Sequence, residues 1–378
     1  MARCSLVPFV LFSCFSLLYL FTKEWIPPSP SPHPSFSPQT QTQTLTLTPT
    51  PTRPSDPSRS KDLDAEVEFD FAPFVRVYKS GRVERLHGTA TVPAGLDPST
   101  GVASRDVAID PATGLTARLF LPADLVPGGG GEGGGARVPI VVYFHGGAFV
   151  IESAFSPFYH NYLNALASRA RALAVSVEYR LAPEHPLPAA YADAWAALRW
   201  AFAGGGGGGD RWVAARGDPA RVFLAGDSAG ANIAHNAAAR AGKGKVRVEG
   251  LVLQNPYFWG REAVGREPRE RWIREGMERS WGFVCAGAMG IDDPAVNPMG
   301  GSGMGMGGWG MRRALVTVAG GTCSGRGLGV RGGAEAERRW RGGGLRGRGE
   351  PHVYFVSNPW SPAAAKEIDV LVSFVHRR

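Results

Sequence analysis

A serine flanked by two glycines stands between an apolar stretch and an alanine-rich stretch, and residues in this order can present a nucleophile. Ser228 lies between Gly226 and Gly230 in the pattern G-D-S-A-G, which has the spacing G-x-S-x-G. Residues 222–224 are apolar and predict a strand, and the alanine-rich residues after the glycine pair predict a helix. The glycines leave room around a strained turn, and the helix N-terminus places partial positive charge where an oxyanion would form. This stretch therefore predicts a nucleophile elbow.

A second glycine motif follows another apolar stretch further upstream. His145, Gly146 and Gly147 come directly after residues 138–144, which read as a strand buried on both faces. Glycines at such a strand end let backbone N–H groups face a cavity. The N–H groups of Gly146 and Gly147, with that of Ala229, are therefore candidates for an oxyanion hole.

A general base for this serine must be a histidine further along the chain, and there are three candidates. His235 falls inside the predicted elbow helix and is expected to pack there or to cap a neighbour, while His376 lies at the C-terminal end. His352 lies in a loop that leads into apolar residues, and we expect residues 351–356 to form the last strand. His352 is the predicted base.

Strands and helices are expected to alternate along the chain around these residues. This order predicts a doubly wound α/β sheet, mostly parallel, with helices on both faces. A charged stretch at residues 260–290, with Trp272 and Trp281, predicts a small helical lid whose tryptophans pack on the body. We expect a hairpin at residues 74–78 and 82–86, strands at 103–109, 115–121, 138–144, 172–177, 246–254 and 313–319, and helices at 158–171, 188–202 and 363–377.

Composition excludes several other classes of function. The 378 residues are 44% hydrophobic, which is ample for a sizeable core. The net charge is +8, and residues 321–350 hold seven arginines against three glutamates, so about half of the excess lies in one segment. A general nucleic-acid surface is therefore disfavoured. The four cysteines, at positions 4, 14, 285 and 323, form neither a disulfide framework nor a zinc-ligand pattern.

The N-terminal residues have the composition of a targeting segment and a tether. Residues 4–21 are apolar behind Arg3, as in a signal peptide or signal anchor, and predict entry into the secretory pathway or membrane anchoring. Residues 23–60 are rich in proline, serine and threonine and predict a disordered linker. The catalytic domain is expected over 61–378. The alternative is a cytoplasmic protein in which this N-terminal extension is not genuine.

Several long motifs together resemble the plant carboxylesterase branch of the hormone-sensitive-lipase-like α/β-hydrolases. They lie, in family order, at residues 73–79, 145–149, 177–191, 226–235 and 292–298. The resemblance implies an α/β-hydrolase fold that cleaves small carboxylic esters without a cofactor. It implies Ser228 as nucleophile, His352 as base, and Gly146, Gly147 and Ala229 as oxyanion donors. The related gibberellin receptors lack the catalytic histidine, so a non-catalytic binder of small hormone-like molecules is the alternative.

The chain departs from the family pattern at the catalytic acid. The family places an aspartate where Thr322 stands, and threonine cannot stabilise an imidazolium by charge. Eighteen of the thirty residues 321–350 are glycine or arginine, with no apolar period for a helix. Three interpretations stay open: a frame-shifted segment, an impaired esterase in which Asp292 or Asp293 replaces the acid, and an RNA-binding arginine-glycine segment. The lack of phenylalanine and tyrosine in the segment disfavours the third.

Overall fold

The structure is a computed structural model and describes residues 63–128, 135–205, 210–244, 246–265, 267–298, 300, 311–319, 343–346 and 350–377. The predicted targeting segment at 4–21, the linker at 23–60 and Thr322 lie outside these residues. Among the described helices, none is long and apolar enough to cross a bilayer.

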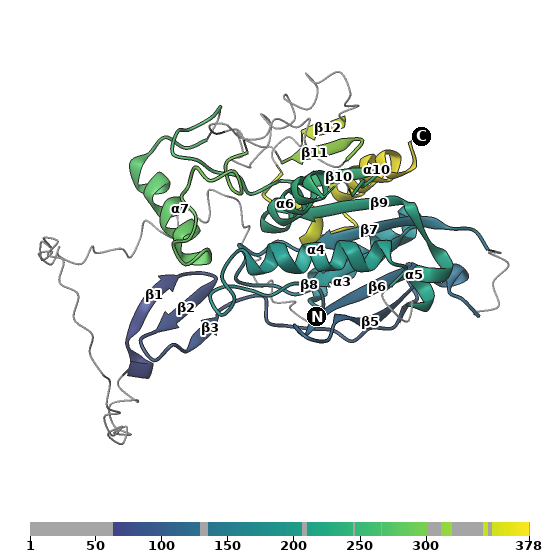
Figure 1. Cartoon of the computed structure of the whole chain (residues 1–378), viewed down its shortest axis with the longest axis horizontal. Coiled ribbons are helices and arrows are strands. Elements are labelled where there is room, and N and C mark those ends of the chain that lie inside the picture. The colour runs from purple at the N-terminus through teal and green to yellow at the C-terminus, as the bar shows by residue number, and fades with distance from the viewer. Residues whose placement is uncertain are drawn as a thin grey trace, which may run out of the picture.

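A nine-stranded sheet forms the centre of the molecule, in the order β12-β11-β10-β9-β7-β8-β6-β5-β4 (Figure 1). The strands from β7 to β12 pair in parallel, and β4, β5 and β6 add an antiparallel edge. The mostly parallel sheet predicted from the alternation of elements is confirmed. The strands are β4 (Leu96–Asp97), β5 (Val102–Asp110), β6 (Leu115–Pro122), β7 (Val138–Phe144), β8 (Leu173–Glu178), β9 (Gly217–Asp227), β10 (Gly250–Gln254), β11 (Ala314–Val318) and β12 (Gly343–Arg346).

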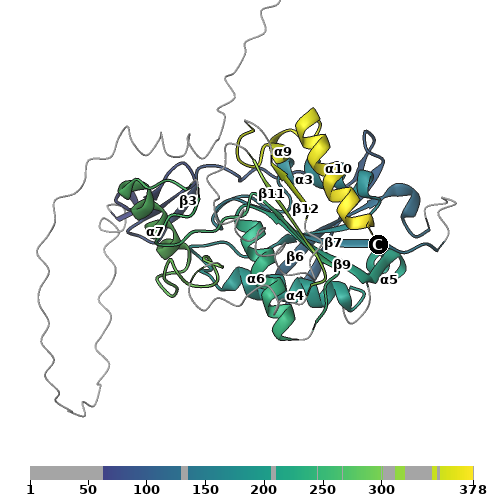
Figure 2. The same cartoon turned by 90° about the horizontal axis from the view of Figure 1, so that it is seen from above.

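Helices cover both faces of this sheet, because the central strands are apolar on both faces. In β7, Val141 and Tyr143 join the core under α3 and α10, while Ile140, Val142 and Phe144 join the core under α4 and α6. Figure 2 shows α3 and α10 on one side of the sheet and α4 and α6 on the other. The helices are α3 (Pro157–Ala170), α4 (Ala189–Phe202), α5 (Arg211–Arg216), α6 (Ala229–Lys243), α7 (Arg271–Val284), α9 (Tyr354–Ser357) and α10 (Pro362–His376), with a 3₁₀ turn at Ala123–Leu125.

A three-stranded antiparallel sheet lies beside α7, outside the main sheet (Figure 1). It consists of β1 (Val67–Phe71), β2 (Val75–Tyr78) and β3 (Val83–Arg85), and β2 and β3 form the predicted hairpin. The ring of Phe69 stacks on Phe283 of α7, with the centroids 4.2 Å apart. Within α7, Trp281 is buried, as expected for a packed tryptophan, whereas Trp272 is exposed. The predicted helical lid therefore corresponds to α7, and the small sheet packs against this helix.

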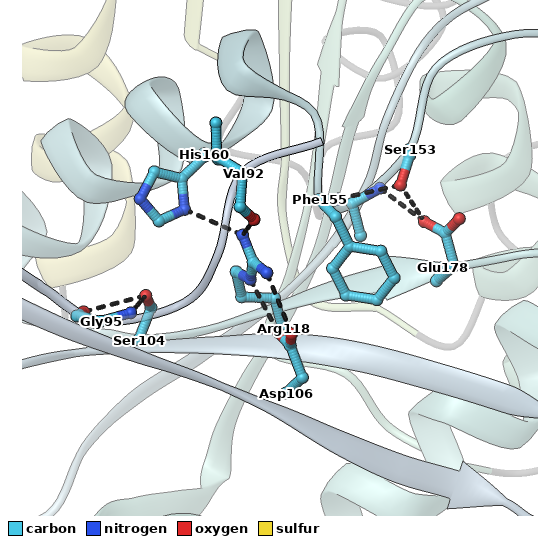
Figure 3. A network of polar contacts seen from close by, with 10 residues as sticks. Val92, Gly95, Ser104, Asp106, Arg118, Ser153, Phe155, His160 and Glu178 are labelled. Carbon is cyan, nitrogen blue, oxygen red and sulfur yellow. Dashed lines mark hydrogen bonds and ion pairs between the residues drawn. The ribbon is translucent and has the colours of Figure 1, made fainter. Parts of the chain in front are cut away.

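A buried arginine connects the antiparallel edge of the sheet to α3 and to the segment that precedes β4 (Figure 3). Arg118 donates to both carboxylate oxygens of Asp106, at 2.7 and 2.9 Å, and to the carbonyl of Val92 at 2.8 Å. Its third contact is Nδ1 of His160, at 3.2 Å, and this nitrogen must accept because arginine only donates. Burial, together with the charge of Arg118, lowers the pKa of His160, which favours the neutral ring. This network anchors α3, which supplies Tyr159 to the site.

Two expectations for individual elements are wrong, and one strand of the main sheet was not expected. Residues 351–356 form a turn and the short helix α9, not a strand: Tyr354, Phe355 and Val356 are buried in the core shared with α3 and α10, and they pair with no strand of the described sheet. Strand β10 begins at Gly250, four residues later than expected. The glycine-rich β12, which pairs with β11, was not predicted.

Candidate active site

Ser228 occupies a strained turn between β9 and α6. Its φ of 51° and ψ of −117° lie outside the regions that a serine usually adopts. Its N–H donates to the carbonyl of Gln254 at 3.0 Å, and its own carbonyl accepts from the N–H of Tyr257 at 3.0 Å. A Cβ at Gly230 would lie 2.0 Å from the carbonyl oxygen of Phe144. Glycine is therefore required two residues after Ser228, because a side chain there would clash with the backbone of β7, as predicted for the elbow.

His352 reaches this serine from the other end of the chain. Its Nε2 lies 2.9 Å from Oγ of Ser228, a hydrogen-bonding distance. The residue belongs to a turn that leads into α9, and the following Val353 has a left-handed φ of 48°. The structure thus brings together the predicted nucleophile and the predicted base, which are 124 residues apart.

The other two candidate histidines have different surroundings. His235 is buried in α6, with its ring edge-on to Phe258 at a centroid distance of 5.1 Å. Burial lowers its pKa to about 4. The Nε2 of His376 lies 2.7 Å from the carbonyl oxygen of Ala170, so this residue joins the ends of α10 and α3. Of the three histidines, His352 is the one with a hydrogen bond to Ser228.

The glycine loop after β7 is oriented differently from the prediction. The N–H of Gly146 lies 2.7 Å from Oη of Tyr159 and 3.1 Å from Oδ1 of Asp227, so it donates into the protein interior. The predicted oxyanion role of Gly146 does not fit this geometry. No hydrogen bond of the described residues uses the N–H of Gly147, and the same holds for Ala148 and Ala229. Gly147 and Ala229 stay predicted donors, and Ala148 becomes a further candidate.

Asp227 was missed by the sequence analysis. It precedes Ser228, is completely buried, and accepts from Tyr143 and Tyr159 at 2.9 Å each, besides Gly146. Burial raises the pKa of this carboxyl to about 7, although the three hydrogen bonds oppose the shift. A carboxylate directly after the uncharged, non-polar residues 222–226 was the available signal.

His145 holds the same loop from the other side. Its ring stacks on Tyr179 at 4.2 Å, and its Nδ1 lies 2.7 Å from the carbonyl of Gly146. Burial lowers its pKa to about 4, so the ring is neutral and Nδ1–H donates. The hydroxyl of Tyr179 donates to the carbonyl of His145 at 2.8 Å. His145 therefore shapes the loop and is not placed as a proton acceptor for Ser228.

The two aspartates considered as replacement acids lie in the loop after α7. Asp292 accepts from the N–H of Arg261 at 2.8 Å and from Asn297 at 3.0 Å. Asp293 accepts from the N–H of Ala295 at 2.8 Å. These contacts stabilise a loop turn. In the described part of the chain, no cluster of three or more histidine, cysteine or acidic side chains could hold a metal ion.

The fold and the elbow define the class of this protein, an α/β hydrolase. A sequence profile described as the α/β hydrolase fold matches residues 141–324. Two solved structures are similar over 72% of this chain: a thermostable carboxylesterase cloned from a metagenomic library (TM-score 0.57, 26% identity, 87% of that chain) and an esterase of the archaeon Pyrobaculum calidifontis (TM-score 0.54, 25% identity, 84%).

Sequence relatives narrow the class. Probable carboxylesterase 5 of Arabidopsis thaliana is 42% identical over 316 residues, which are 81% of this chain and 97% of that protein. The 2-hydroxyisoflavanone dehydratase of Glycyrrhiza echinata is 42% identical over 262 residues, 66% of this chain and 78% of that protein. The chain therefore belongs to the plant carboxylesterase family, as the motifs predicted.

Proposed function

We propose that this protein hydrolyses small carboxylic esters through an acyl-enzyme on Ser228. Oγ attacks the ester carbonyl while Nε2 of His352 takes its proton, and the imidazolium then protonates the departing alcohol. Water, activated by the same histidine, releases the acid and restores the serine. The N–H groups of Gly147, Ala148 and Ala229 are the proposed donors to the oxyanion.

One observation carries this proposal: the 2.9 Å contact between Nε2 of His352 and Oγ of Ser228, at a serine whose backbone is strained. Membership of the carboxylesterase family supports the same chemistry. The helix N-terminus of α6 directly behind Ser228 favours the negative charge of the tetrahedral intermediate.

We propose further that turnover is impaired, because Thr322 stands at the family's acid position. Replacement of the triad aspartate in serine hydrolases lowers kcat by about 10⁴, since the imidazolium loses its counter-charge and its orientation. Activity above the uncatalysed rate is still expected from the oxyanion donors and the serine-histidine pair.

Hydrolysis of p-nitrophenyl acetate by the purified protein and by Ser228→Ala tests the ester hydrolase function. We expect slow turnover that is lost in the variant, and labelling of Ser228 by a fluorophosphonate. Equal rates for the two proteins would refute the proposal. Tight ligand binding without turnover would instead indicate the non-catalytic binder.

The substitution Thr322→Asp tests the cause of the impairment. If the whole segment 321–350 is altered, this single change leaves kcat within about threefold of the starting value, whereas loss of the acid alone predicts a gain on the order of 10³ to 10⁴. Sequencing the transcript across codons 320–350 is the direct control.

A further inference from the structure

A buried carboxyl group on α10 lies at the junction of three segments that build the site. Glu367 is 3% exposed. Its Oε1 accepts from Nε2 of Gln254 at 3.0 Å and from Oγ1 of Thr317 at 2.6 Å, and its Oε2 accepts from Oη of Tyr354 at 2.6 Å. Burying a carboxylate is costly, and here the charge is compensated by three hydrogen bonds from neutral donors.

Each donor belongs to a segment next to the proposed chemistry. Gln254 ends β10, and its backbone carbonyl accepts from the N–H of Ser228 at 3.0 Å. Thr317 lies in β11, the strand that precedes the acid position. Tyr354 follows His352 by two residues. One carboxyl group therefore links three segments: β10, which hydrogen-bonds to Ser228; β11, which precedes the acid position; and the residues that follow His352.

The segment that carries His352 depends on such support. Val353 has a left-handed φ of 48°, a strained backbone conformation for a β-branched residue. Helix α9 has four residues and is too short to be stable alone. Burial and the charge of Glu367 raise the pKa of Tyr354, so its phenol stays protonated and can donate. The Tyr354 to Glu367 bond thus holds a strained segment in place.

We propose that Glu367 is a positioning residue that keeps His352 within hydrogen-bonding distance of Ser228, acting through Tyr354. Its carboxylate accepts hydrogen bonds from β10, from β11 and from the segment after His352, and these bonds fix the positions of the three segments relative to one another. This inference rests on the proposed function, because the pair that it positions is the proposed catalytic pair.

The substitutions Tyr354→Phe and Glu367→Gln test the inference, singly and together. Tyr354→Phe should lower kcat by about tenfold or more with little change in KM, because a misplacement of about 1 Å costs roughly 10²-fold. If the two residues act as a unit, the double variant is no slower than the worse single variant. Rates are expressed per site titrated by a fluorophosphonate, so that loss of folded protein does not count.

Tyr78→Phe is the matched control, because it removes the same kind of bond, from a tyrosine hydroxyl to Oε2 of Glu84 at 2.5 Å, in the separate small sheet. It should leave kcat unchanged. A kcat per titrated site within twofold of the wild type in Tyr354→Phe would overturn the inference. Loss of activity in Tyr78→Phe equal to that in Tyr354→Phe would do the same.

A second readout does not need turnover. Amide hydrogen exchange over residues 350–357 should become at least about tenfold faster in Tyr354→Phe and stay unchanged in Tyr78→Phe. Unchanged exchange in Tyr354→Phe would refute the positioning role even if the wild type proved inactive. Equal rates for the wild type and Ser228→Ala would refute the proposed function alone, so the two failures are distinguishable.

Discussion

The substitution Gly230→Ala probes the packing of the elbow against β7. The added Cβ would lie 2.0 Å from the carbonyl oxygen of Phe144 and 2.5 Å from that of His145. A carbon to oxygen contact is normally about 3.3 Å or longer, so the two segments must separate by about 1 Å. Both oxygens belong to the backbone and cannot rotate away. The separation moves Ser228 away from Gly147, which follows in the same loop.

Two measurable losses follow from this separation. Overpacking of a tight core costs about 1–3 kcal/mol, and a displacement of about 1 Å at a reacting group costs roughly 10²-fold in rate. We therefore expect Gly230→Ala to lower kcat/KM for p-nitrophenyl acetate by about 10²-fold and to lower Tm by several degrees.

Gly276→Ala in α7 is the matched control, because a Cβ there meets no atom within 4 Å. It should leave kcat/KM unchanged and stabilise the protein by about 0.4–1 kcal/mol, since alanine loses less conformational freedom on folding than glycine. If Gly230→Ala keeps kcat/KM within about threefold and Tm within about a degree of the wild type, the described packing of the elbow is refuted.

Three further predictions concern the rest of the molecule. Burial lowers the pKa of His235 from 6.5 to about 4, so the unfolded chain binds more protons than the folded chain as the pH falls. The free energy of unfolding of the wild type should therefore fall by about 2 kcal/mol between pH 7 and pH 5 through this residue. Urea unfolding of His235→Leu at both pH values should show a fall smaller by that amount, and an equal fall would contradict the assignment. Arg85 pairs with both carboxylate oxygens of Glu184 at 2.7 and 2.8 Å, so Arg85→Ala should expose residues 63–86 to limited proteolysis, and unchanged cleavage would contradict this role. Residues 1–60 fused to a fluorescent reporter are expected to direct it to the secretory pathway or a membrane, and a cytosolic reporter would support the alternative.

Local patterns were sufficient for most of the fold. The apolar run of β7 and the serine between Gly226 and Gly230 specify a buried strand and a sharp turn through interactions of near neighbours. His352 was predicted because only three histidines follow Ser228 and two fall inside predicted helices or at the chain end. The hydrogen bond between His352 and Ser228 is consistent with that choice.

Other parts of the site depend on contacts between distant residues. Whether the N–H of Gly146 faces the cavity or the interior was decided by Asp227 and Tyr159, which accept it. The stretch after His352 reads as a strand by composition, but helices α3 and α10 enclose it and bury all three apolar residues in a helical turn. Glu367 had one local signal, a carboxylate on the apolar face of α10 between Ala364 and Ile368.

The sequence alone thus predicted most of the elements, their order and the proposed serine-histidine pair, because these depend on periodicity, on turn sterics and on side-chain chemistry. The tertiary structure decided that the N–H of Gly146 points into the interior, and it placed the buried carboxyl groups of Asp227 and Glu367 against segments next to Ser228 and His352. The reason is physical: a backbone N–H or a buried carboxyl pairs with whichever partner packing brings within about 3 Å, and those partners come from other strands and helices.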